Sequence, residues 1–270
     1  MTDSANITDA EFAKFRALIY EIAGISLSDA KKLLLTGRLA KRLRTHNLGS
    51  YYEYFKFVTS GAASDELQIM VDLLTTNETY FFREEKHFQF LDQEVLSNFP
   101  SGRNFDIWSA ACSSGEEVYT LAMVLAERWG VHGTWSVTGS DISTKVLEAA
   151  QRGYYPMERA RNMPHEYLRK YCLKGVREHA GSLLIDQPLR NHARFLQVNL
   201  NATLPELGLF DVIFLRNVMI YFDVETKRQV VAKLIHKLKP GGYFIIGHAE
   251  SLHGISEALQ TVKPTIYRKP

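Results

Sequence analysis

A turn of small and acidic residues at positions 109 to 117 carries side chains whose types and spacing suit binding of a small molecule. The apolar residues before it predict a buried strand, and Val118 and Leu121 recur at helical spacing. Ligands of open α/β sheets bind where a strand ends and a helix begins. The next predicted strand ends at Asp141, whose carboxylate can accept hydrogen bonds from ribose hydroxyls. The turn and this acid therefore predict a nucleoside site.

The turn is poorly suited to a phosphate group. Gly115 is its single glycine, and the pattern G-x-G-x-x-G, which lets a backbone approach a pyrophosphate, is absent. The carboxylates of Glu116 and Glu117 at the helix start would also repel an anion. These features favour a cationic nucleoside without phosphate, such as S-adenosylmethionine. The alternatives are a tight turn without a ligand and a nicotinamide dehydrogenase, which would share Asp141 but would need the missing glycines.

Composition narrows the class of protein. The chain has 270 residues, 46% of them hydrophobic, which is enough for one large domain or two smaller ones. A formal net charge of +2 favours neither a nucleic-acid-binding protein nor a disordered chain. Cys112 and Cys172 have neither disulfide nor metal spacing, so we expect no metal and a reducing, cytoplasmic location. No targeting segment or bilayer-length apolar run is present, and we expect no membrane insertion.

Residues 1–75 predict an all-helical N-terminal domain. Thr8 to Glu11 form a capping box, and the helix that follows ends at Gly24. Further helices are expected to start at Ser28, Ser50 and Ser64.

Residues 76–104 form an interdomain segment with a helix around Leu91 and a break at Pro100 to Gly102. From 105 to 270, strands and helices alternate, which is typical of a doubly wound sheet. The strands are expected at about 105–109, 134–140, 194–198, 210–215 and 243–247, with helices at about 116–128, 143–151 and 224–238. The stretch between the second and third strands is too long for a plain connection, and it predicts an inserted antiparallel hairpin at about 168–195.

Four segments together resemble the chemotaxis receptor methyltransferases of the CheR family, which are S-adenosylmethionine-dependent glutamate O-methyltransferases. They are residues 77–88 (NETYFFREEKHF), 108–117, 210–222 and 238–244. The resemblance spans almost the whole chain. It implies an α/β fold, namely a Rossmann-like class I methyltransferase domain with a small all-α N-terminal domain and an inserted antiparallel β-subdomain. The chain departs from the family at Ser114, where Thr is frequent, and at Val118, where Pro is frequent.

The resemblance also implies roles for individual residues. Arg83 and Tyr221 are the expected catalytic residues, beside the reacting methyl group. The acceptor carboxylate, with a reference pKa of about 4.3, is already ionised at neutral pH, so orientation is expected to replace a general base. The product would be S-adenosylhomocysteine. The residues expected to bind the cofactor are Asn77, Thr79, Arg83, Glu117, Asp141, Asn199, Leu200, Arg216 and Asn217.

Taken singly, these residues have structural alternatives. Asn77 and Thr79 could cap the following helix, Arg83 could pair with a neighbouring glutamate, and Asn217 could bond its own turn. His248 could equally be structural or functional. At the level of the whole protein, a non-catalytic scaffold or sensor that binds S-adenosylmethionine or S-adenosylhomocysteine is also open.

The implied partner is the cytoplasmic helical bundle of methyl-accepting chemoreceptors, and we expect a monomer. A basic stretch is expected to steer docking, the alternative being a solvated helix face; it comprises Lys31, Lys32, Arg38, Lys41, Arg42 and Arg44. In some family members the β-subdomain binds a C-terminal tethering peptide of the receptor by strand addition. Arg177 and Arg190 are the candidate partners for its carboxylates.

Overall fold

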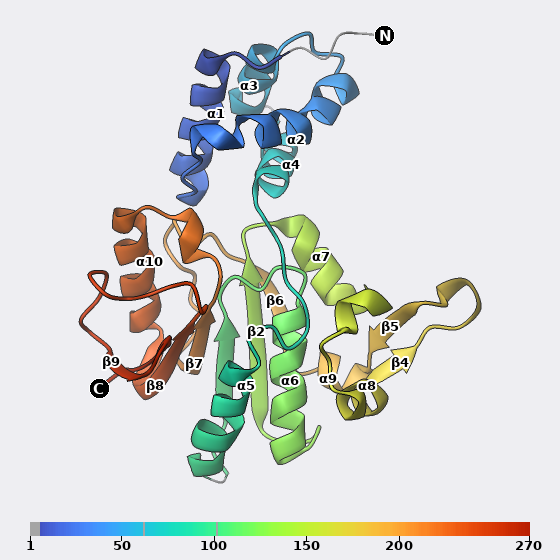
Figure 1. The fold of residues 1–270 in the computed structure, drawn as a ribbon, viewed down its shortest axis with the longest axis vertical. Coiled ribbons are helices and arrows are strands. Elements are labelled where there is room, and N and C mark those ends of the chain that lie inside the picture. The colour runs from blue at the N-terminus through green and yellow to red at the C-terminus, as the bar shows by residue number, and fades with distance from the viewer. Residues whose placement is uncertain (1–5, 62, 101) are drawn as a thin grey trace.

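Helices make up the N-terminal part of the computed structural model, which describes residues 6–61, 63–100 and 102–270 (Figure 1). Thr8 caps α1 through the predicted capping box with Glu11, and Gly24 ends the helix with a φ of 70°. Ser28 precedes a short 3-10 helix, η1 (Asp29–Lys31), that leads into α2. The helices are α1 (Asp9–Ala23), α2 (Lys32–Thr45), α3 (Tyr51–Thr59) and α4 (Ser64–Leu74).

The predicted starts of these helices are confirmed with one exception. The Ser50 hydroxyl accepts from the backbone of Glu53 and caps α3, as expected. α4 begins at Ser64, the expected residue. The exception is α2, which begins at Lys32, after η1, and not at Ser28. Residues 1–5, included in the predicted domain, lie outside the described residues, as does Ser101 in the predicted break.

A mostly parallel sheet with the strand order β6-β2-β1-β7-β8-β10-β9 forms the centre of the second part. The first five strands in this order, β6, β2, β1, β7 and β8, pair in parallel with their neighbours. β10 pairs antiparallel with both β8 and β9. The strands are β1 (Phe105–Ser109), β2 (Trp135–Asp141), β6 (Ala193–Gln197), β7 (Phe210–Leu215), β8 (Leu238–Ile246), β9 (Gln260–Lys263) and β10 (Ile266–Arg268). The predicted doubly wound sheet is confirmed, and β9 and β10 are additions to it.

Helices cover the sheet, and alternate strand residues enter different cores. Ile107 and Val212 pack with α6 and the segment around α5, whereas Trp108 and Ile213 pack with α10 and the N-terminal helices. Because the helical part shares this second core, it is packed against the sheet. The helices are α5 (Lys86–Phe90), α6 (Glu116–Trp129), α7 (Thr144–Arg152) and α10 (Val224–His236); α5 continues as the π-helix η2 (Leu91–Val95) and the 3-10 helix η3 (Leu96–Asn98).

The insertion between β2 and β6 projects to one side of the sheet (Figure 1). Its predicted hairpin is formed by β4 (Cys172–Lys174) and β5 (Ser182–Ile185). A further strand, β3 (Tyr154–Pro156), pairs with the other edge of β5, so this small sheet takes in residues before the expected start near 168. It also carries α8 (His165–Tyr171) and α9 (Gln187–Arg190), with the 3-10 turns η4 (Met157–Ala160) and η5 (Arg177–His179).

Among the helices of the described ranges, none combines the length and apolar character that a membrane crossing requires.

Candidate functional site

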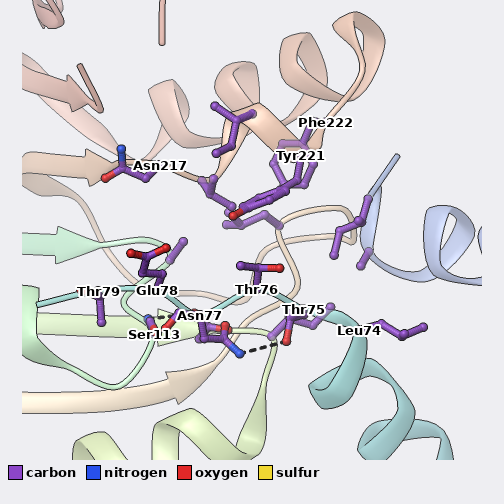
Figure 2. Close-up of a pocket in the computed structure, with 18 of the residues that line it drawn as sticks. Leu74, Thr75, Thr76, Asn77, Glu78, Thr79, Ser113, Asn217, Tyr221 and Phe222 are labelled. Carbon is purple, nitrogen blue, oxygen red and sulfur yellow. Dashed lines mark hydrogen bonds between the residues drawn. The ribbon is translucent and has the colours of Figure 1, made fainter. Parts of the chain in front are cut away.

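A cavity of about 460 Å³ lies where the helical part, the interdomain segment and the sheet meet (Figure 2). Its walls include the end of α1, the segment after α4, and the residues that follow β1, β2, β6 and β7. This volume is in the range of sites for small molecules. All of the site residues predicted from the sequence line it: Asn77, Thr79, Arg83, Glu117, Asp141, Asn199, Leu200, Arg216, Asn217 and Tyr221.

The turn after β1 has a backbone that only a small residue permits. Gly115 has a φ of 93°, and a Cβ atom there would lie 2.7 Å from the Cβ of Ala150. Ser113, in the same turn, has a φ of 49°. Its hydroxyl donates to the carbonyl oxygen of Asn77 at 3.0 Å, a bond drawn in Figure 2. The turn is therefore tied to the interdomain segment at the cavity wall.

Asp141 is fixed at the end of β2. Its Oδ2 accepts from the backbone of Ser113 at 2.9 Å, and its Oδ1 accepts from the backbone of Ser143 at 3.0 Å. Burial raises the pKa of this carboxyl, while the backbone hydrogen bonds oppose that rise. Because each carboxylate oxygen has two lone pairs, Asp141 keeps the capacity to accept further hydrogen bonds. The geometry is compatible with the predicted contact to ribose hydroxyls.

Glu117 and Arg216 form a buried ion pair in the cavity wall. Arg216 Nη1 lies 2.7 Å from Glu117 Oε2, and the two side chains are 2% and 13% exposed. The hydroxyl of Ser109 donates to the other oxygen of Glu117 at 2.7 Å. The carboxylate of Glu117 lies in the first turn of α6, and its negative charge disfavours a phosphate there.

Glu84 is a second carboxylate bound to Arg216, and the sequence did not identify it as part of the site. Its Oε2 lies 3.0 Å from Arg216 Nη2, and its Oε1 accepts from Asn217 Nδ2 at 3.1 Å. Burial opposes ionisation, but the hydrogen bond from Asn217 and the charge of Arg216 prevail and lower the pKa of Glu84 to about 2. Glu84 therefore positions two residues that line the cavity.

Asn77, Thr79 and Arg83 do not make the purely structural contacts that the sequence left open for them. The next helix begins at Lys86, so Asn77 and Thr79 do not cap it. Asn77 Nδ2 donates to Thr75 Oγ1 at 3.1 Å within its own segment. Arg83 donates to the carbonyl oxygen of Glu78 at 2.7 Å, and within the described ranges it forms no ion pair with a neighbouring glutamate. Asn217, likewise, bonds Glu84 rather than its own turn.

Asn199 and Tyr221 join the two parts of the molecule at the cavity. Asn199 Nδ2 donates to the carbonyl oxygen of Ile22 at 2.7 Å, so this amide is used in packing against α1. The carbonyl oxygen of Tyr221 accepts from the backbone of Ser26 at 2.8 Å, and an isolated bridge links Ile25 with Phe222. Figure 2 shows the Tyr221 ring on the wall opposite Asn77.

Arg159, in the insertion, is a further residue that the sequence analysis missed. It donates to the carbonyl oxygen of Thr79 at 2.6 Å and lies 3.5 Å from the fully buried carboxylate of Glu116. Burial raises the pKa of Glu116. Thr79 is thus held by the insertion as well as by its own segment. The sequence carries no motif around Arg159 that could have signalled this contact.

Three of the basic residues expected to steer docking are bonded within the chain. Lys32 Nζ lies 2.6 Å from Asp9 Oδ1. Arg38 donates to the carbonyl oxygens of Leu74 and Thr75, at 3.2 and 2.9 Å. Arg42 binds both carboxylate oxygens of Glu66, which is 5% exposed. Arg38 and Arg42 are therefore held by groups of the chain itself, and steering of docking by the basic stretch stays a prediction. Lys31, Lys41 and Arg44 are exposed.

Two family models match the chain. The family model described as CheR methyltransferase, all-alpha domain, matches residues 10–75, and the one described as CheR methyltransferase, SAM binding domain, matches residues 77–268. The chain is similar to the chemotaxis protein methyltransferase of Escherichia coli (39% identity, covering 99% of this chain and 93% of the relative). It is also similar to chemotaxis protein methyltransferase 2 of Pseudomonas aeruginosa (38% identity, 96% and 93% covered).

Among solved structures, the chain resembles the N-methyltransferase NodS from Bradyrhizobium japonicum in complex with S-adenosylhomocysteine. The TM-score is 0.43 at 16% identity, and the match covers 74% of this chain and 95% of the other.

Proposed function

The chain belongs to the CheR methyltransferase family, and from this premise we propose that it transfers methyl groups from S-adenosylmethionine to glutamate side chains of chemoreceptors. The observation that carries the proposal is that the predicted cofactor residues, drawn from distant parts of a family-matched sequence, line a single cavity. The nicotinamide dehydrogenase alternative has no counterpart in the family match.

The residues present fit the cofactor. Asp141 lies at the end of a strand and lines the cavity, where a carboxylate can accept from ribose hydroxyls, and the carboxylate of Glu117 favours a cation. When bound, S-adenosylmethionine supplies an electrophilic methyl group on its sulfonium. Asn77, Thr79, Asn199, Leu200, Arg216 and Asn217 are proposed to complete its binding site.

The chain's own contribution to the reaction is orientation and exclusion of water. The acceptor carboxylate forms a bond to the methyl carbon as the carbon–sulfur bond breaks and its electron pair stays on sulfur, which gives a glutamyl γ-methyl ester and S-adenosylhomocysteine. We propose that Arg83 holds the acceptor oxygen by a charge-assisted hydrogen bond and that the Tyr221 hydroxyl donates as a neutral partner. Arg83 is half-buried at the cavity, where such a bond is less screened than in water.

The proposed substrate is the cytoplasmic helical bundle of the receptor, and the enzyme is proposed to act there as a monomer. Since Arg38 and Arg42 are engaged internally, the exposed Lys31, Lys41 and Arg44 on and before α2 are the proposed steering charges.

A receptor tethering peptide is proposed to add to the exposed edge of β4 in the insertion. Leu173, on that edge, is 53% exposed. Arg177 is exposed in the adjoining turn, whereas Arg190 already donates to Gln187 and lies against Gly153. Arg177 is therefore the better candidate for a carboxylate partner.

The test is transfer of radiolabelled methyl groups from S-adenosylmethionine to receptor-bearing membranes, measured as base-labile methanol. Arg83→Ala is expected to bind the cofactor normally by calorimetry but to lose turnover. Arg103→Ala, which changes an exposed arginine outside the cavity, is the matched control and is expected to retain activity. Loss of cofactor binding in Arg83→Ala would remove the acceptor role from Arg83. Cofactor binding by the intact protein without label on any receptor would favour the non-catalytic sensor.

A further inference from the structure

Glu84, His87 and His248 converge behind the wall of the cavity, from the start of α5 and from the loop after β8. Their candidate ligand atoms all lie within 4.8 Å of one another. His87 Nδ1 is 3.5 Å from Glu84 Oε2, and the two imidazole rings lie 4.7 Å apart at an angle of 69°. The backbone N–H of His248 donates to Glu84 Oε2 at 3.1 Å, which fixes the third residue beside the other two.

The hydrogen bonds assign the tautomer of His87. Thr265 Oγ1 donates its single hydrogen to the carbonyl oxygen of Pro264 at 2.6 Å, so it can only accept from His87 Nε2, 2.8 Å away. Nε2 therefore carries the proton, and Nδ1 presents a lone pair.

This lone pair faces a carboxylate instead of a donor. His87 is 1% exposed, and its Nδ1 has no hydrogen-bond partner within the described part of the chain. A nitrogen lone pair 3.5 Å from a carboxylate oxygen is electrostatically unfavourable in a buried setting. A cation bound to His87 Nδ1 would satisfy this nitrogen. Because Glu84 Oε2 already accepts from Arg216 and from the backbone of His248, the carboxylate would bind the ion through Oε1.

The surroundings tolerate such a cation. Arg216 is paired with both Glu84 and Glu117, so two carboxylates share its one positive charge. Glu84 Oε1 accepts one hydrogen bond, from Asn217, and keeps a lone pair for a ligand bond. His248 is exposed, which gives its ring freedom to approach and gives an ion a path from solvent.

We propose that Glu84, His87 and His248 form a binding site for Zn²⁺ or a similar divalent transition metal. Two imidazole nitrogens and one carboxylate oxygen are a ligand set that zinc accepts, with bonds of about 2.0–2.2 Å and water in the remaining position. The small inward movement that these bond lengths require falls on the exposed ring of His248. The proposal replaces our expectation of no metal, which rested on cysteine spacing, because these ligands come from sequence positions far apart.

The test measures zinc binding directly and does not depend on methyl transfer. The full-length protein, freed of metal by a chelator, is titrated with Zn²⁺ in competition with 4-(2-pyridylazo)resorcinol. We expect one site per chain, and at least about tenfold weaker binding in His248→Ala. Because His248 is exposed, this variant is expected to keep the wild-type circular dichroism spectrum. His253→Ala, which removes another exposed histidine of the same loop, is the matched control and is expected to bind zinc like the wild type.

Two further results decide the matter. Zn²⁺ at saturating concentration is expected to raise the Tm of the wild type by several degrees, and that of His248→Ala by less, because the ion joins α5 to the loop after β8. Co²⁺ is expected to give a visible absorption band that His248→Ala loses. Zinc affinity equal in the wild type and His248→Ala would overturn the proposal, as would a wild-type protein that cannot compete with the indicator.

Discussion

Replacing Arg216 by Met would remove the cation that joins the carboxylate of Glu117, in the cavity wall, to that of Glu84 behind it. Arg216 is bonded to Glu117 at 2.7 Å and to Glu84 at 3.0 Å, and it also donates to the carbonyl oxygen of Arg83. Met keeps an apolar stem of similar length but leaves both carboxylates without their counter-ion. Removing one partner of a buried ion pair costs about 3–5 kcal/mol. Because Glu117 and Glu84 are 13% and 14% exposed, water reaches them in part, and we expect the lower end, about 3 kcal/mol.

Thermal unfolding followed by circular dichroism measures this loss. In a protein of this size 1 kcal/mol shifts Tm by about 2–4 °C, so the Tm of Arg216→Met should fall by roughly 6–12 °C. Arg228→Met is the control, because Arg228 is 53% exposed and lies 4.0 Å from its partner Glu225. An exposed pair of this kind contributes at most about 1 kcal/mol, or a few degrees.

A second substitution separates charge imbalance from lost packing. Adding Glu117→Gln to Arg216→Met neutralises one of the stranded carboxylates and should recover about 1–2 kcal/mol of the loss. A Tm for Arg216→Met within 2 °C of the wild type would refute the reasoning. So would a double variant that is less stable by the full sum of the two single losses.

Three further predictions concern other parts of the molecule. Burial opposes ionisation of Glu66, but hydrogen bonds, first from Arg42, lower its pKa to about 2 from an ordinary 4.5. The ionised carboxylate therefore stabilises the fold above about pH 4.5, and this contribution is lost as the pH falls toward 2. Glu66→Gln should reduce the change of Tm with pH over that window, and an unchanged dependence would contradict the prediction. Gly115→Ala should lower the Tm in thermal melts more than Gly102→Ala does. Both glycines have positive φ, but of these two only Gly115 has other atoms within 4 Å of the new Cβ. Equal decreases in Tm would argue against crowding at Gly115. Arg38→Met should weaken S-adenosylmethionine binding roughly two- to tenfold in calorimetry. Arg38 holds the carbonyl oxygens of Leu74 and Thr75, which directly precede the cavity-lining residues Asn77 and Thr79. Unchanged affinity would show that these hydrogen bonds do not position the site.

The sheet could be predicted where a strand is a buried apolar run, as in Phe210–Leu215. It could not be predicted where neighbours define the strand. Gln260–Lys263 is exposed at every position, and Ile266–Arg268 is too short to show alternation. The strand predicted at about 243–247 begins earlier, since β8 starts at Leu238. A register shift between Phe210 and Val212 accommodates Pro240 and the glycines after it.

The site shows the same division. Residues directly after strands, such as Asp141 and Arg216, could be located because parallel strands end at one edge of a sheet. Glu84 was considered only as a partner for its neighbour Arg83, whereas its carboxylate reaches Arg216, 132 positions away. Arg159 lies in an insertion whose placement against Thr79 depends on tertiary packing. Contacts of this kind leave no local pattern in a single sequence.

The placement of β10 between β8 and β9 has a consequence for synthesis on the ribosome. β8 pairs on one side with β7, and on its other side with Ile266–Arg268. Until those residues leave the exit tunnel, the growing chain presents β8 as an unpaired edge, and β9 has no neighbour in the sheet. Unpaired edges are templates for association with other chains. The interval between emergence of residue 246 and emergence of residue 268 from the tunnel is therefore a period in which the nascent chain is exposed to aggregation.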